Sequence, residues 1–182
     1  MKDAFREIKE NRKSLTIRWV SRTFAGPNTF RMLPKGKAEK ARQFLTEHVS
    51  DGQSLGAASN QPAYDRRHRQ IVARMQKSCR LPFGHAVKLL DLYVKELATR
   101  RGVISENLSK RIYRFAHVPV DRIILDNVRH DYPEASKPLT LRKALKRMSL
   151  SEYEEIQAFL RDRANLSGSS VLDYDLRWAD RP

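Results

Sequence analysis

Residues 81–102 read LPFGHAVKLLDLYVKELATRRG, and this stretch decides the fold class. Its apolar residues follow one another at intervals of three, four and three positions: Val87, Leu90, Val94 and Leu97. That spacing lines one face of an α-helix and predicts a helix over about 85–101. A break at 81–84 precedes this helix, because Pro and Gly interrupt helices, and Gly102 marks its end.

Helical periodicity continues on both sides of this stretch, and the sequence shows no strand pair and no internal repeat. Further helices are predicted over about 3–24, 37–49, 63–80, 120–130 and 141–148, with two more capped by Ser105 and by Ser149. Residues 50–62 are rich in Gly, Ser, Asn and Gln and are expected to form a loop, whereas 171–178 receive no assignment. The prediction is an all-α fold, a compact bundle of about eight helices.

The length of 182 residues suits a single domain over 1–182, with N-terminal helices and a loop (1–62), a core (63–164) and a C-terminal segment (165–182). No apolar run reaches the roughly 18 residues of a membrane span, and the start lacks a secretory leader. A single cysteine, Cys79, excludes an internal disulfide and a four-cysteine metal site. The five histidines include no pair four positions apart. We therefore expect a cytoplasmic protein, at a bacterial or archaeal nucleoid, with no metal and no cofactor.

The net charge points to a polyanionic partner. The chain has 36 Lys and Arg against 21 Asp and Glu, a formal charge of +15. These cations are spread through helical segments, and no basic amphipathic helix with an aromatic face favours a membrane. We expect a monomer that binds double-stranded DNA and no membrane. One basic group precedes the break at 81–84: Arg66, Arg67, Arg69, Arg74, Lys77 and Arg80. A second comprises Arg142, Lys143, Lys146 and Arg147. Both groups could instead be solvated helix faces.

Two segments, 81–88 and 118–121, together resemble the helix-hairpin-helix DNA glycosylases. In that superfamily a Leu-Pro-Gly-Val-Gly-x-Lys hairpin precedes a Pro-Val-Asp segment that opens a helix. Gly84 and Ala86 match the two hairpin glycines and His85 matches the valine between them. Lys88 falls on the catalytic lysine and Asp121 on the catalytic aspartate. The resemblance covers roughly 81–164, with Phe83 interrupting the hairpin motif and Ala86 replacing a glycine.

The resemblance implies a central helix-hairpin-helix and a base-excising activity. The interval from Lys88 to Asp121, 121 − 88 = 33 residues, is long, as in the compact all-α archaeal branch that acts on 8-oxoguanine. Lys88 would attack the sugar and form a Schiff base, and Asp121 would stabilise the cationic sugar. Phe83, Gly84, His85 and Ala86 would hold a DNA phosphate. Trp178, and less strongly Trp19, would stack on the extruded base. The setting would be DNA repair or antiviral defence.

Other interpretations remain open. Lys88 and Asp91 could form an ordinary surface pair three positions apart on a helix, and Asp121 could simply complement a helix dipole. The protein could then be a non-enzymatic DNA-binding module, such as a phage, plasmid or defence regulator. A helical HEPN-type ribonuclease toxin is a further alternative, because Arg42 to His48 and Arg111 to His117 fit the Arg-x4–6-His spacing of that family.

Overall fold

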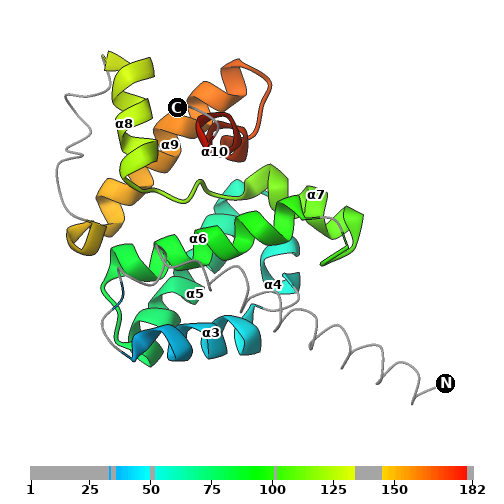
Figure 1. Ribbon diagram of the computed structural model, residues 1–182. Helices are drawn as coiled ribbons and strands as arrows, with labels where there is room; N and C mark the ends of the chain where they lie inside the picture. Colours follow the sequence, from blue (N-terminus) through cyan, green and yellow to red (C-terminus); the bar gives the residue numbers. More distant parts are fainter. Residues whose placement is uncertain (1–32, 34–35, 50–51, 101, 134–144, 180–182) are drawn as a thin grey trace.

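The computed structural model describes residues 33, 36–49, 52–100, 102–133 and 145–179 (Figure 1). Over these residues the regular elements are helices, with no strand. In chain order they are α3 (Lys37–His48), α4 (Gln53–Gly56), α5 (Gln61–Cys79), α6 (Phe83–Thr99), α7 (Glu106–Phe115), α8 (Arg122–Asp131), the 3-10 helix η2 (Leu145–Arg147), α9 (Leu150–Leu166) and α10 (Val171–Ala179). The all-α prediction is confirmed. No helix in this described part is long and apolar enough to cross a bilayer.

Helix α6 lies in the middle of the molecule and packs against α5, α7 and η2. In Figure 1, α3, α4 and α5 lie on one side of it, and α8, α9 and α10 lie on the other. The predicted apolar face is buried in full: Val87, Leu90, Val94 and Leu97. Burying each such side chain stabilises the fold by about 1.5–3 kcal/mol, so this face holds α6 in the core.

The junction between α5 and α6 is shorter than the sequence suggested. Helix α5 ends at Cys79, Arg80 adopts a left-handed conformation with φ 52°, and α6 begins at Phe83 rather than at residue 85. Pro82 occupies the N-cap with φ −58°, a value that its ring already imposes. Gly84 consequently lies in the first turn of α6, and not in the interhelical turn.

Of the predicted loop over 50–62, the described residues 52–62 contain regular structure. They contain α4 and the start of α5, where the Asn60 side chain accepts a hydrogen bond from Ala63 N at 2.9 Å. Pro62 follows in the first turn, where its missing N–H leaves no bond unmade. The loop prediction failed because capping by Asn60 and Pro62 extends α5 backwards through polar residues.

The C-terminal half also corrects two expectations. Residues 119 and 120 precede α8 in an extended segment, and Asp121 is the N-cap of α8 rather than a first-turn residue. Residues 145–147 form a 3-10 turn, and 141–144 lie outside the described residues, as does the helix expected over 3–24. The capping box between Ser149 and Glu152 is confirmed, and 171–179 form α10.

Candidate functional site

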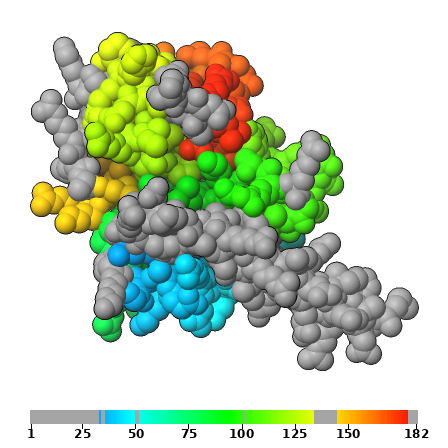
Figure 2. All heavy atoms as spheres, viewed as in Figure 1, coloured from blue at the N-terminus to red at the C-terminus, as the bar shows by residue number. Residues whose placement is uncertain are grey.

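Lys88 and Asp121 meet across two helices. Lys88 Nζ donates a hydrogen bond to Asp121 Oδ2 at 3.2 Å, with 13% and 29% of the two side chains exposed. The other oxygen, Asp121 Oδ1, accepts from Ile124 N at 3.0 Å and caps α8. Asp121 is thus fixed by its own helix, and its second oxygen is directed at the lysine. The pair is partly open to solvent, beside α8, which reaches the surface in Figure 2.

Hydrogen bonds from the buried Gln157 side chain fix the segment that places Asp121 beside Lys88. Residues 116–120 are buried and join α7 to α8 without regular secondary structure. Gln157 of α9 holds them: its Oε1 accepts from Val118 N at 3.1 Å and its Nε2 donates to Val118 O at 2.8 Å. Both polar groups of Val118 are therefore satisfied without a strand partner.

His85 lies one turn before Lys88 and is 8% exposed. Its Nδ1 has no hydrogen-bond partner among the described residues. Burial lowers the pKa of His85, and the nearby charges of Lys146 and Lys88 lower it further. The ring is therefore held neutral beside the lysine.

The residues matched to the hairpin are covered. Gly84, His85 and Ala86 are buried, and a Cβ on Gly84 would lie 1.8 Å from the carbonyl oxygen of Leu145 in η2. Gly84 is thus required by close packing against a backbone. A DNA phosphate could reach Gly84 only if η2 moved aside, and the phosphate-binding role of residues 84–86 stays a prediction. Phe83 is half-buried and lines a pocket.

The basic side chains of α5 are mostly exposed: Arg66, Arg69, Arg74, Lys77 and, just after the helix, Arg80. Arg67 is half-buried and donates to Ser54 O at 3.1 Å. Of the second basic group, Lys146 and Arg147 are exposed on η2, and 142–143 lie outside the described residues, as does Trp19. Trp178 lies on α10, with its side chain outside the described set.

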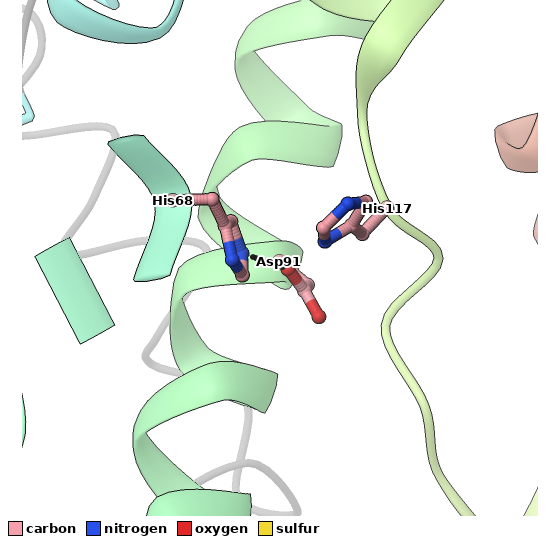
Figure 3. Close-up of side chains that lie close together, drawn as sticks. All are labelled: His68, Asp91 and His117. Atoms are coloured by element: carbon pink, nitrogen blue, oxygen red, sulfur yellow. Dashed lines mark hydrogen bonds and ion pairs between the residues drawn. The ribbon is translucent and has the colours of Figure 1, made fainter. Parts of the chain in front are cut away.

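A second polar cluster is buried between α5, α6 and α9. His68 Nε2 lies 2.7 Å from Asp91 Oδ1, and each side chain is 1% exposed. Tyr153 donates its hydroxyl proton to Asp91 Oδ2 at 2.7 Å, and the Tyr153 hydroxyl oxygen lies 2.9 Å from His117 Nδ1. Figure 3 shows how His68, Asp91 and His117 converge from α5, α6 and the segment after α7.

The outer edge of this cluster is charged. His117 Nε2 lies 2.8 Å from Asp65 Oδ1, and Asp65 Oδ2 pairs with Arg161 at 3.5 Å. Burial alone would raise the pKa of Asp65, but hydrogen bonds from His117 and Gln61, with the charges of His117 and Arg161, lower it to about 2. Burial and the neighbouring His68 lower the pKa of His117, against the raising effect of its hydrogen bond to Asp65.

A pocket of about 510 Å³ opens beside this cluster. His68, His117 and Tyr153 line it, together with the cations Arg69 and Arg161. Arg69 also pairs with Glu154 at 3.3 Å. The pocket wall therefore combines buried hydrogen-bonding groups with two ion pairs, Arg69–Glu154 and Arg161–Asp65.

The sequence did not reveal this cluster. Its members come from α5, α6, the segment after α7, and α9, and His68 and Asp91 alone are 23 residues apart, so no local spacing joins them. The one available signal was Asp91, which falls on the apolar face of α6 between Val87 and Val94. The alternative pairing of Lys88 with Asp91 is wrong, because Asp91 points inward to His68 and Lys88 pairs with Asp121.

The ribonuclease motif residues lie in different surroundings. Arg42 pairs with Glu39 at 3.1 Å. Arg111 is exposed, whereas His117 is 5% exposed.

Comparison of the chain with protein-family models, with curated proteins and with solved structures finds no match.

Proposed function

We propose that the protein is a DNA glycosylase with β-lyase activity, in which Lys88 is the nucleophile and Asp121 the electrostatic stabiliser. One observation carries the proposal. Lys88 and Asp121, which are 33 positions apart and match a catalytic pair by sequence, meet with Lys88 Nζ 3.2 Å from Asp121 Oδ2. The pair is partly open to solvent, as a site for a macromolecular substrate must be. The net charge of +15 supports a polyanionic partner.

The geometry suits the charge changes of base excision. As the bond between C1′ and the base breaks, its electron pair leaves with the base, which then takes up a proton. The sugar becomes cationic, and in this proposal the Asp121 carboxylate stabilises that charge. Attack by Lys88 on C1′ requires the neutral amine, so the Lys88 ammonium has to release one proton to water when the substrate opens the ion pair.

The covalent product explains the lyase step. After Lys88 Nζ bonds to C1′, opening of the sugar ring gives an imine. Loss of a proton from C2′ then expels the 3′ phosphate, and hydrolysis of the imine releases the lysine. Exposed cations on α5 and on η2 would hold the DNA backbone, with an affinity that falls steeply as salt rises.

The test is borohydride trapping on duplex DNA with an abasic site. We expect the wild-type protein to form a covalent adduct, and Lys88→Ala to lose it. Lys110→Ala is the matched control, because Lys110 is an exposed lysine of α7 that pairs with Glu106 four positions away. An equal adduct yield in Lys88→Ala and wild type would overturn the assignment. Tight, salt-sensitive DNA binding with no adduct would favour the non-enzymatic module.

A further inference from the structure

The buried cluster described above contains an unassigned group of metal-binding side chains. One ligand atom from each of His68, Asp91 and His117 lies within 4.8 Å of the other two. The three residues come from different elements and are 1%, 1% and 5% exposed, so the fold assembles and shields them (Figure 3). Lys88 and Asp121 contribute no atom to this group, and the inference is independent of the proposed activity.

The first argument is charge. Asp91 accepts hydrogen bonds from His68 and Tyr153, yet within the described part of the chain it forms no ion pair with Lys or Arg. His68 pairs with Asp91 as a cation only when its ring carries two protons. Beside a neutral His68 the buried carboxylate has no cation, which is costly because the apolar interior does not replace its hydration. A positive ion between Asp91 and the two imidazoles would remove that cost.

The second argument is the supply of hydrogen-bond protons. The Asp65 carboxylate can only accept, so the proton between it and His117 belongs to His117 Nε2. His117 Nδ1 then presents a lone pair toward the cluster. Tyr153 Oη lies 2.9 Å from His117 Nδ1 and 2.7 Å from Asp91 Oδ2. The hydroxyl has one proton, and both of these neighbouring atoms can accept it. Electron pairs therefore outnumber protons at the centre of the cluster.

The third argument is the orientation of His117. A metal-binding histidine commonly donates its other ring N–H to a carboxylate, which fixes the tautomer and the ring plane. Asp65 occupies that position, and Gln61 and Arg161 hold Asp65 in turn. This outer arrangement is what a ligating His117 Nδ1 requires.

We propose that His68, Asp91 and His117 bind one first-row divalent metal ion, for which Zn²⁺ is the probe. Two imidazoles and one carboxylate are a common ligand set for such ions. On binding, exchange with water moves the His68 proton from Nε2 to Nδ1, so that Nε2 and Asp91 Oδ1 both offer electron pairs to the metal. Small side-chain rotations bring each ligand atom to about 2.0–2.2 Å from the metal. Because His68 and His117 line the pocket, water from the pocket can fill the remaining coordination positions of the metal ion.

The experiment uses the full chain, purified with a chelator and dialysed free of metal. Zn²⁺ titration by calorimetry and elemental analysis of the dialysed complex should both give one ion per chain, and Zn²⁺ should raise the midpoint of thermal unfolding. Asp91→Asn and His117→Ala should abolish binding. His48→Ala and His130→Ala are matched controls, because these two histidines are exposed, and both variants should bind as wild type does.

A gentler variant keeps the test decisive if the ligand variants fail to fold. Asp65→Asn removes no ligand but loses the carboxylate behind His117, and should weaken Zn²⁺ binding by about 10–100-fold. Wild type loaded with Co²⁺ should show visible d–d absorption that Zn²⁺ displaces. The proposal is overturned if wild type binds no Zn²⁺, or if His117→Ala or Asp65→Asn binds Zn²⁺ as tightly as wild type.

Discussion

Asp121 uses its two carboxylate oxygens for different tasks. Oδ1 caps α8 through Ile124 N, and Oδ2 accepts from Lys88. Capping by Asp or Asn is about equally good, so the structural task and the charge are separable by substitution. If Asp121 only caps α8, Asp121→Asn should keep full activity. If Asp121 also stabilises the cationic sugar, the same variant should fold normally but lose activity.

We expect Asp121→Asn to fold as wild type but to excise a base more slowly, by about 100–1,000-fold, the effect of removing one preorganised charge-stabilising group. Its adduct formation on a ready-made abasic site should persist, because Lys88 is intact. Single-turnover excision assays and borohydride trapping measure the two steps. Unchanged excision alongside an unchanged unfolding temperature would contradict the role given to Asp121.

His85 makes stability depend on pH. Its pKa is lowered from the ordinary 6.5 by burial and by Lys146 and Lys88, so the folded protein resists a proton that the unfolded chain accepts. The contribution of neutral His85 is therefore present above pH 6.5 and lost as the pH falls toward the folded-state pKa. We expect His85→Leu to lose less stability than wild type between about pH 7 and about pH 5 in urea unfolding. Identical losses would contradict this.

At the level of elements, the contact between α6 and η2 depends on Gly84. A methyl group there meets the backbone oxygen of Leu145 at 1.8 Å, whereas one on Gly56 meets the Leu108 side chain, which can rotate away. Gly84→Ala should destabilise by about 1–3 kcal/mol, and Gly56→Ala by less. Chemical denaturation of the two variants compares them directly. Equal losses of stability in the two variants would mean that η2 moves away from α6 easily and that residues 83–86 are accessible.

The segment between α7 and α8 depends on Gln157. Replacing it with Leu leaves the buried N–H and C=O of Val118 without partners, which should cost about 2–4 kcal/mol. Gln157→Glu keeps an acceptor for Val118 N, so its stability should lie between that of Gln157→Leu and that of wild type. Trapping yield should fall with the same ranking, because Val118 positions Asp121. Loss of stability with full activity in Gln157→Leu would contradict that positioning.

Elements were predictable where the signal was local. The face of Val87, Leu90, Val94 and Leu97 predicted α6, and Ser149 with Glu152 predicted the start of α9, because spacing and capping act within a few residues. The meeting of Lys88 with Asp121 was expected only through the family resemblance. The convergence of His68 and His117 on Asp91 depends on packing between distant elements, which no local pattern encodes.

For the whole molecule, the charge distribution predicts how binding responds to salt. If the exposed face of α5 contacts DNA phosphates, replacing Arg66, Arg74 and Lys77 with Gln should lower the slope of log affinity against log salt by about 0.9 per lost contact. Fluorescence anisotropy at several salt concentrations measures that slope. Lys110→Gln with Arg111→Gln on α7 is the control. A slope unchanged in the α5 variant would place the DNA on another face.

The most direct test of the central claim is to locate the covalent bond. Wild-type protein is reduced with borohydride on abasic duplex DNA, digested, and the peptide carrying the sugar remnant is identified by mass spectrometry. The account predicts one modified peptide, with the remnant on Lys88 Nζ, opposite Asp121. A remnant on another lysine, or no remnant at all, would contradict it.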